Sequence, residues 1–286
     1  IYLNSLNARN LNLPAGQLRY KAKDVIAEAK GIGPLLDEVR AAEERYKKDI
    51  EKIKAVIDQY CVDNNSRVLI PSFSLDRTPY ILWILYSLFG KDENYNVPIL
   101  VDSPLANRLL DCYSSILDGK SKEQFDEMMS WKNIHRIIQP EDSKAAIASS
   151  GAKVILSSSG MLTAGRSIKW TQNILPHAED CILFMGYTGE DTLGYKIKHE
   201  KDNKTINING KPYKNKAQIV DLKSFSSHMQ RQDMINYYKT LNCEKIYLVH
   251  GDSNKIEFKH DLEDAISDCL KSTKVVAVNS GTKISL

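Results

Sequence analysis

The stretch Arg67-Val-Leu-Ile-Pro-Ser-Phe-Ser-Leu-Asp-Arg77 joins a short apolar run to a polar loop. The run from Arg67 to Pro71 has the length and the branched side chains of a buried strand. An apolar helix is expected to follow, beginning at Thr78-Pro79 and reaching Phe89. The sequence therefore predicts a strand, a loop and a helix in this order, which is the unit from which parallel sheets are built.

The same pattern recurs along the chain. Further strands are predicted at 97–101, 134–138, 152–156 and 181–185, with helices at 105–117, 143–149 and up to Trp170. A long amphipathic helix, from Leu35 to Tyr60, is predicted to precede them. Repeated strand–helix units predict an α/β domain with a mostly parallel sheet flanked by helices.

Polar segments follow four of these strands, at residues 71–77, 102–104, 157–166 and 186–194. Ligands of open parallel sheets bind outside the carboxyl ends of the strands. We therefore expect the four segments to converge on one edge of one domain.

The character of the sequence changes after Gly194. Residues 195–220 are rich in Lys and Asn, and their alternating apolar residues predict antiparallel strands around Asn209-Gly210. A helix is predicted at 232–241, a strand at 245–249, a helix at 256–270 and a last strand around 275–278.

Composition excludes several classes of protein. The 286 residues are 26% charged and 42% hydrophobic, as in an ordinary globular protein, and the net charge of +3 does not by itself predict nucleic-acid binding. The most apolar stretch, residues 80–89, is far shorter than the roughly 20 residues of a membrane-spanning helix. Five cysteines without a CxxC pair favour reduced, mostly buried thiols and a cytoplasmic protein.

Two histidines stand in a chemically suggestive context. His250 ends a predicted strand and is followed by Gly251 and Asp252, so its imidazole could bind a metal while the carboxylate orients the ring. His228 lies among serines before a predicted helix, and the intervening helix–strand unit would bring it to the same edge. A metal site, an acid–base pair and hydrogen-bonded structural histidines all remain open at this point.

These phrases resemble a known family. Phe225-Ser-Ser-His228 and the strand ending in His250-Gly-Asp252 resemble the closing motifs of metallo-β-lactamase-fold nucleases that carry a β-CASP domain, such as RNase J and the endonuclease of cleavage and polyadenylation. Segments 68–77, 98–106, 158–166 and 186–194 are similar to further motifs of that family, in the same order. Leu3-Asn-Ser-Leu-Asn-Ala-Arg9 resembles the phrase that ends the first lactamase segment.

The resemblance implies a domain organisation. Residues 1–5 would end the first metallo-β-lactamase segment, 6–223 would form the β-CASP domain, and 224–286 would return to the metallo-β-lactamase αββα fold. The family's His-x-His-x-Asp-His zinc motif does not occur in these residues. We therefore expect a portion of a longer protein, inactive alone, whose missing N-terminal segment supplies most of the zinc ligands.

The resemblance also implies an activity, the hydrolysis of RNA phosphodiesters with two zinc ions. His250 would bind one zinc, and Asp252 would orient the imidazole ring of His250. His228 would lie beside the scissile phosphate. A histidine at position 250 is typical of the RNA-cutting members. Hydroxyl, guanidinium and backbone contacts to RNA and its phosphates would come from Ser72, Arg77, Ser103, Ser159, Gly160, Met161, Arg166, Gly186, Tyr187 and Thr192.

Two departures from the family pattern keep a second hypothesis open. Asn4 stands at the position of a catalytic acid and Gln230 at that of an aspartate, and an amide side chain cannot take over a carboxylate's proton chemistry. The alternative is a non-catalytic RNA-binding or scaffold paralogue. A doubly wound small-molecule enzyme would explain the parallel sheet but not the two histidines. A homodimer is a further expectation from the family, and no membrane partner is expected.

Overall fold

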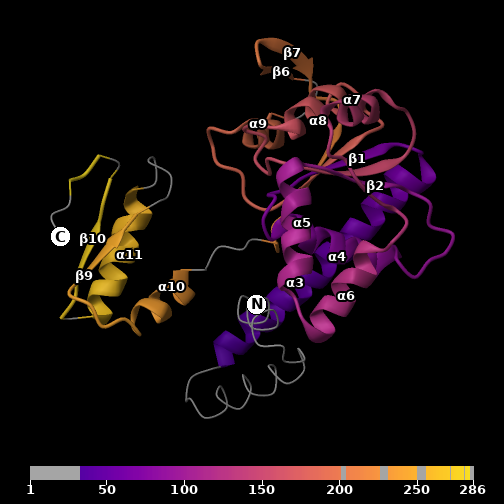
Figure 1. The fold of residues 1–286 in the computed structure, drawn as a ribbon. Helices are drawn as coiled ribbons and strands as arrows, with labels where there is room; N and C mark the ends of the chain where they lie inside the picture. The colour runs from indigo at the N-terminus through magenta and orange to yellow at the C-terminus, as the bar shows by residue number, and fades with distance from the viewer. Residues whose placement is uncertain are drawn as a thin grey trace. The chain divides into compact units, whose positions relative to one another are not determined.

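The computed structural model describes residues 33–200, 204–225, 231–249, 256–270, 272–279 and 281–283 (Figure 1). The chain divides into two compact units, one ending at Ser226 and one beginning at Ser227. Each unit has its own hydrophobic core, and each is described by itself below.

The larger unit is an α/β domain. Its helices and strands, in chain order, are α3 (Gly33–Ile57), the π-helix η1 (Asp58–Asp63), β1 (Arg67–Pro71), α4 (Arg77–Phe89), β2 (Ile99–Asp102), α5 (Pro104–Ile116), α6 (Gly119–Met129), β3 (Ile134–Arg136), α7 (Pro140–Ala148), β4 (Lys153–Ser157), α8 (Arg166–Ile174), β5 (Cys181–Met185), α9 (Leu193–His199), β6 (Thr205–Ile208), β7 (Lys211–Lys214) and β8 (Gln218–Leu222).

Six strands form the central sheet in the order β3-β2-β4-β1-β5-β8, and every neighbouring pair is parallel. The expectation of a mostly parallel sheet flanked by helices is thereby confirmed. Parallel pairing places the carboxyl ends of all six strands at one edge of the sheet, so the loops that follow them meet there.

The two faces of the sheet carry separate cores, because alternate residues of a strand point to opposite faces. On β1, Val68 and Ile70 pack with α3, α4, α5 and α6, whereas Leu69 packs with α8, α9 and the β6–β7 hairpin. Figure 1 shows these helix groups on opposite sides of the sheet. Burial on both faces explains why the central strands are continuous apolar runs.

The sequence prediction was wrong for the strand β8. The alternation of apolar residues through 195–220 predicts antiparallel strands, but Gln218–Leu222 pairs with β5 in parallel along its whole length. Only β6 and β7 form an antiparallel hairpin. Local alternation cannot distinguish the two cases, because both pairings present one residue in two to each face.

Helix α9 was also missed within the segment expected to form antiparallel strands. The side chain of Thr192 accepts a hydrogen bond from the Tyr195 amide at 3.2 Å, which satisfies a free donor of the first turn. This cap begins the helix directly after the polar segment that follows β5.

The smaller unit comprises α10 (Arg231–Tyr238), β9 (Lys245–Leu248), α11 (Ile256–Cys269) and β10 (Lys274–Ala277). The strands β9 and β10 form a parallel pair, and Ile246, Leu248 and Val275 share a core with Ile235 and Ile266 from the helices. The strand predicted before His250 is therefore present. No helix within the described ranges is both long and apolar enough to cross a membrane.

All five cysteines are free, but the expectation of mostly buried thiols was wrong. Cys61 and Cys181 are buried, and burial raises the pKa of each thiol to about 12. Cys112, Cys243 and Cys269 are exposed. Since the thiolate is the reactive form, the buried pair is expected to be inert in the folded protein.

We expect an alkylating reagent near neutral pH to modify Cys112, Cys243 and Cys269 in the folded protein, and to reach Cys61 and Cys181 only after unfolding. Peptide mass spectrometry before and after addition of denaturant measures this difference. Modification of Cys61 as fast as Cys112 under native conditions would contradict the described packing.

The substitution Ile155→Ala is expected to lower the free energy of unfolding by about 2–5 kcal/mol, because Ile155 is 0% exposed in the central strand β4 and its truncation leaves a cavity. Ile116→Ala is the matched control, since Ile116 is 72% exposed. Urea unfolding of both variants measures the difference, and equal losses would contradict the assignment of the core.

Candidate functional site

The four polar segments predicted to converge do meet at the carboxyl edge of the sheet. The Ser72 amide donates to the Ser157 carbonyl at 2.9 Å, which joins the ends of β1 and β4. The Ser103 hydroxyl lies 3.2 Å from the Ser74 hydroxyl and 2.6 Å from that of Ser158. Hydroxyl groups from three loops therefore form one connected chain, and we call this edge the serine rim.

Two of the predicted contact residues lie beneath the surface of the serine rim rather than on it. Ser72 is 1% exposed, and its hydroxyl is 3.1 Å from the Thr78 hydroxyl. Ser103 is 2% exposed and caps α5 by accepting from the Ala106 amide at 3.2 Å. Both hydroxyls therefore fix the loops in place.

The segment after β4 forms a tight turn in which close contacts leave no room for a side chain at two positions. The half-buried Ser159 accepts from the Thr163 amide at 2.8 Å. Gly165 has a φ of +82°, and a Cβ atom there would lie 2.5 Å from the Ser158 carbonyl oxygen. A Cβ at Gly160 would lie 3.0 Å from the Phe73 ring. The glycines of this motif thus allow close approach of two loops.

A buried carboxylate lies under the same turn. Asp102, at the end of β2, is 0% exposed, and its Oδ1 is 2.6 Å from Nη1 of Arg166. Its Oδ2 accepts from the Ser143 hydroxyl at 2.6 Å and from the Trp170 indole at 2.7 Å. These contacts compensate the loss of hydration and tie α7 and α8 to the end of β2.

The guanidinium of Arg166 is directed to the protein interior by this pairing. Besides Asp102, it donates to the Ile137 carbonyl at 3.2 Å and to the Ile138 carbonyl at 2.8 Å. The sequence motif correctly marked Arg166 as a residue of this edge. It did not show that a buried aspartate is the partner.

The segment after β5 completes the serine rim. Gly186 has a φ of +137°, and the Arg77 guanidinium lies 4.0 Å from the place where its Cβ would be. The Gly194 amide donates to the Met161 carbonyl at 3.0 Å, so this segment is joined to the turn after β4. Tyr187, between them, is 49% exposed.

Sequence reasoning missed Lys198. This lysine is 8% exposed, and its ammonium donates to the Gly186 carbonyl at 2.9 Å and pairs with Asp221 at 2.7 Å. It also lies over the Phe184 ring. Within a Lys-rich segment nothing in the local sequence marks one lysine as buried, so only the tertiary structure reveals it.

Large apolar side chains are exposed in the loops of the serine rim and in the first turn of α5. Phe73, Leu75, Leu105 and Tyr187 are between 46% and 62% exposed, and each follows the carboxyl end of a strand. Aromatic side chains beside hydroxyl and guanidinium groups are typical of surfaces on which nucleic-acid bases stack and phosphates bind.

The residues predicted to act in metal binding and acid–base chemistry lie outside the described residues. These are Asn4, His228, Gln230, His250 and Asp252. Among the residues that are described, no three His, Cys, Asp or Glu side chains lie close enough together to hold a metal ion.

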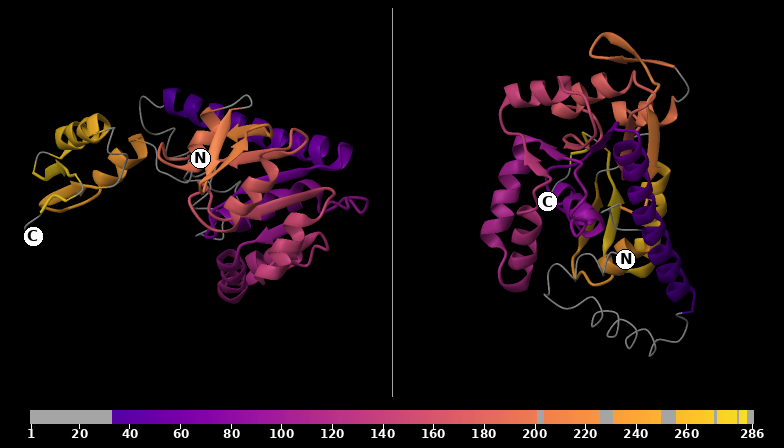
Figure 2. Two further views of the ribbon diagram at one scale, coloured as in Figure 1. Left: turned by 90° about the horizontal axis from the view of Figure 1, so that it is seen from above. Right: turned by 90° about the vertical axis from the view of Figure 1, so that its right-hand side faces the viewer.

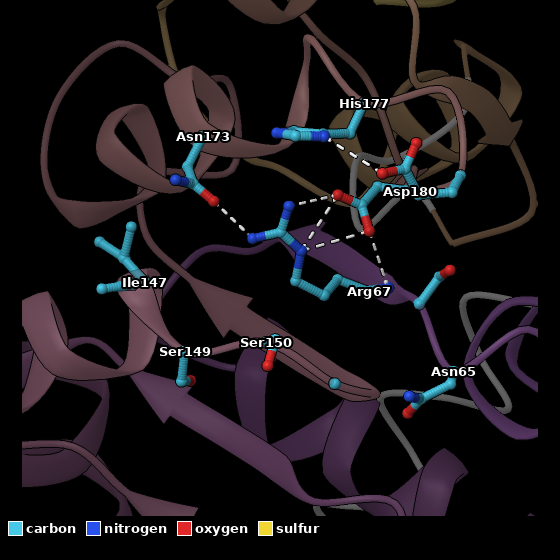
Figure 3. Close-up of a pocket in the computed structure, with 12 residues that line it drawn as sticks. Asn65, Arg67, Ile147, Ser149, Ser150, Asn173, His177 and Asp180 are labelled. Atoms are coloured by element: carbon cyan, nitrogen blue, oxygen red, sulfur yellow. Dashed lines mark hydrogen bonds and ion pairs between the residues drawn. The ribbon is translucent and has the colours of Figure 1, made fainter.

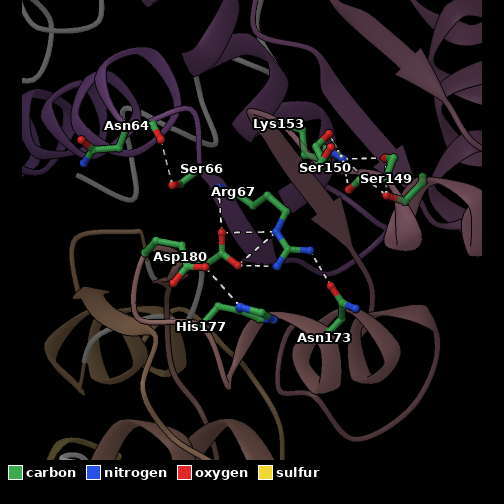
Figure 4. Close-up of polar contacts among 11 residues, drawn as sticks. Asn64, Ser66, Arg67, Ser149, Ser150, Lys153, Asn173, His177 and Asp180 are labelled. Carbon is green, nitrogen blue, oxygen red and sulfur yellow. Dashed lines mark hydrogen bonds and ion pairs between the residues drawn. The ribbon is translucent and has the colours of Figure 1, made fainter.

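A pocket of about 320 Å³ lies at the opposite, amino edge of the sheet (Figure 3). In it Arg67 donates to both carboxylate oxygens of Asp180, at 3.2 and 3.0 Å from Nε, and also contacts Asn173. Lys153 turns away toward α7, where it donates to the Ser149 carbonyl at 2.8 Å (Figure 4). Desolvation lowers the pKa of Lys153. These contacts stabilise the start of β1 and the end of α7.

Comparison with known families matches two parts of the chain. The family model of the Beta-Casp domain matches residues 78–197, which include most of the serine rim. The model of the Zn-dependent metallo-hydrolase RNA specificity domain matches residues 212–267. The resemblance to the β-CASP family that its motifs indicated is thereby confirmed.

Curated relatives share about a quarter of their residues with this chain. It is 27% identical to the transcription termination factor FttA of Methanocaldococcus jannaschii, over 82% of the chain and 38% of the relative. It is 26% identical to ribonuclease TTHA0252 of Thermus thermophilus, over 85% and 57%, and 24% identical to the endoribonuclease YSH1 of Eremothecium gossypii, over 86% and 32%. The chain thus spans about a third to nearly three fifths of the length of these relatives.

Asp102→Ala is expected to lower the free energy of unfolding by about 3–5 kcal/mol, because it leaves the Arg166 guanidinium and the Trp170 indole without their buried partner. Asp111→Ala is the control, since Asp111 pairs with Arg136 at the surface and its loss costs within about 1 kcal/mol. Urea unfolding measures both, and similar costs would show that the Asp102 contacts do not hold the serine rim together.

Proposed function

We propose that this chain is the RNA-binding part of a metal-dependent ribonuclease. The observation that carries the proposal is the serine rim, where hydroxyls, a guanidinium and exposed aromatic rings from the loops after β1, β2, β4 and β5 meet at one edge. The domains matched by residues 78–197 and 212–267, and relatives named as ribonucleases, support an RNA substrate.

The proposed boundaries follow the family motifs. Residues 1–5 would end a first metallo-β-lactamase segment, residues 6–223 would form the β-CASP domain, and residues 224–286 would return to the metallo-β-lactamase fold. The division of the described chain near residue 226 is compatible with this assignment.

The contacts at the serine rim suggest a division of labour among the ten predicted RNA-binding residues. Positioning is proposed for the residues whose polar groups bind protein, Ser72, Ser103, Arg166 and Thr192. Direct contact with phosphate, sugar or base is proposed for the other six, Arg77, Ser159, Gly160, Met161, Gly186 and Tyr187. Of these, Tyr187 is exposed, Gly160 is buried and could offer only its backbone, and the other four are half-buried.

Zinc is proposed as the cofactor, with two ions in the whole protein. The described residues do not fit such a site by themselves, since they contain no cluster of potential ligands. His250 is the proposed ligand from this chain, with Asp252 orienting its ring, and the other ligands are proposed to come from a preceding metallo-β-lactamase segment.

His228 is proposed to lie beside the scissile phosphate, where a protonated imidazole would stabilise negative charge or donate a proton. The proposed location is the cytoplasm, where free thiols such as those of all five cysteines persist. A homodimer is also proposed, on the family resemblance alone.

A second candidate function is a non-catalytic RNA-binding or scaffold paralogue. The observation that favours it is the pair of amides, Asn4 and Gln230, at positions where the family has carboxylates. The two candidates share the serine rim and differ only in the chemistry that follows binding.

Cleavage of a labelled RNA by the full-length protein distinguishes them. We expect chelation of the metal to abolish cleavage, and His250→Ala to reduce the rate at least about 100-fold, because loss of a ligand should exceed the usual cost of losing a residue that merely orients one. His260→Ala is the control, since His260 is an exposed histidine of the same unit. RNA binding, measured separately, should persist in both variants.

The substitution Asn4→Asp tests the alternative. A nuclease limited by Asn4 should gain activity, and equal cleavage by the two proteins would show that this position does not limit the rate. RNA that is bound but cut by neither protein would establish the scaffold function and overturn the nuclease.

A further inference from the structure

The β6–β7 hairpin carries a concentration of positive charge that the serine rim does not explain. Between residues 203 and 220 the sequence contains four lysines and no acidic residue. These four side chains alone carry more charge than the net +3 of the entire chain. All four are exposed, and they are Lys204, Lys211, Lys214 and Lys216.

The hairpin is firmly built. Asn209, with a φ of +53°, and Gly210, with a φ of +80°, form the tight turn that a two-residue hairpin loop requires. Ile206 and Ile208 are each 2% exposed and pack into the core shared with α8 and α9. The hairpin is therefore anchored by its two buried isoleucines and is not a loop surrounded only by solvent.

The base of the hairpin is anchored as well. Asn215 is 3% exposed, and its side-chain amide donates to the carbonyls of Ile197 and Glu200 at 3.1 and 3.0 Å. The Lys216 amide donates to the Leu175 carbonyl at 2.9 Å. The lysines are therefore presented from a fixed platform, which lowers the entropic cost of binding a ligand.

The hairpin strands present lysines on both of their faces. Opposite residues of an antiparallel pair share a face, so Lys214 lies with Thr205 on the side away from Ile206, whereas Lys211 lies opposite Ile208 on the other face. Both lysine side chains are nevertheless exposed. In the described part of the chain no carboxylate lies within ion-pair distance of any of the four ammonium groups. Figures 1 and 2 show the hairpin projecting beyond α8 and α9.

The hairpin and the serine rim lie at opposite ends of the same two helices. Both α8 and α9 begin at the rim, where Arg166 and Gly194 make their contacts, and both end beside the hairpin base. Nine residues of α8 correspond to about 14 Å. The lysines are thus too far away to belong to the contacts of the rim.

We propose that the β6–β7 hairpin is a second contact surface for RNA, which binds backbone phosphates of a strand that extends past the serine rim. This inference rests on the proposed RNA substrate. Exposed lysine ammonium groups are suited to phosphates, and as flexible point charges they would bind without reading sequence. The hairpin would thereby favour long RNAs over short ones.

The test is the salt dependence of RNA affinity, measured with the full-length protein and a long single-stranded RNA in the presence of chelator, so that the RNA stays intact. Changing all four hairpin lysines to Gln should make the slope of log affinity against log salt shallower by about 3, since each phosphate contact on a single strand contributes about 0.7. The same four positions changed to Arg should keep the parental slope.

The matched control removes four exposed lysines from the opposite helical layer, on α3 and α6, and should leave the slope unchanged. The control positions are Lys47, Lys48, Lys52 and Lys120. Circular dichroism verifies that each variant is folded.

Equal slopes for the Gln variant and the control would overturn the hairpin proposal while leaving the RNA substrate intact. A parental protein without salt-dependent affinity for RNA would instead overturn the proposed function, and the hairpin proposal with it.

Discussion

The buried contacts of Asp102 are the constraint on which the carboxyl edge of the sheet depends. This carboxylate has no access to water, and it is compensated by Arg166, Ser143 and Trp170 from two different helices. A charge in a low-dielectric interior is tolerated only when its partners are held in place. The end of β2 and the helices α7 and α8 are therefore fixed relative to one another. The loops that connect them are held in place as a result.

The serine rim follows from this arrangement. Ser103, next to Asp102, caps α5 and shares hydrogen bonds with Ser74 and Ser158, so three loops are joined through a chain of hydroxyl groups. The close approach of the loops excludes side chains at Gly160 and Gly165. A rigid edge with exposed rings and polar groups is suited to an extended polyanion, whereas in the pocket at the other edge the charges of Arg67 and Asp180 are paired with each other.

Much of the fold and of the candidate site could be predicted from the sequence. The strands at 67–71 and 181–185 were predicted to the residue, because a strand buried on both faces is a continuous apolar run between polar loops. The parallel placement of Gln218–Leu222, the burial of Lys198 and the inward direction of Arg166 could not be predicted. Each depends on a partner distant in the chain, and local patterns carry no information about such partners.

The sequence by itself determined most of the strands and helices, the family resemblance, and the residues that gather at one edge, because periodicity and short motifs are properties of neighbouring residues. Only the tertiary structure decided which of those residues are available to a ligand. Ser72, Ser103 and Arg166 read as contact residues in the sequence, yet their polar groups bind protein. The physical reason is that a side chain's hydrogen-bond partners and exposure are set by which distant segments pack against it.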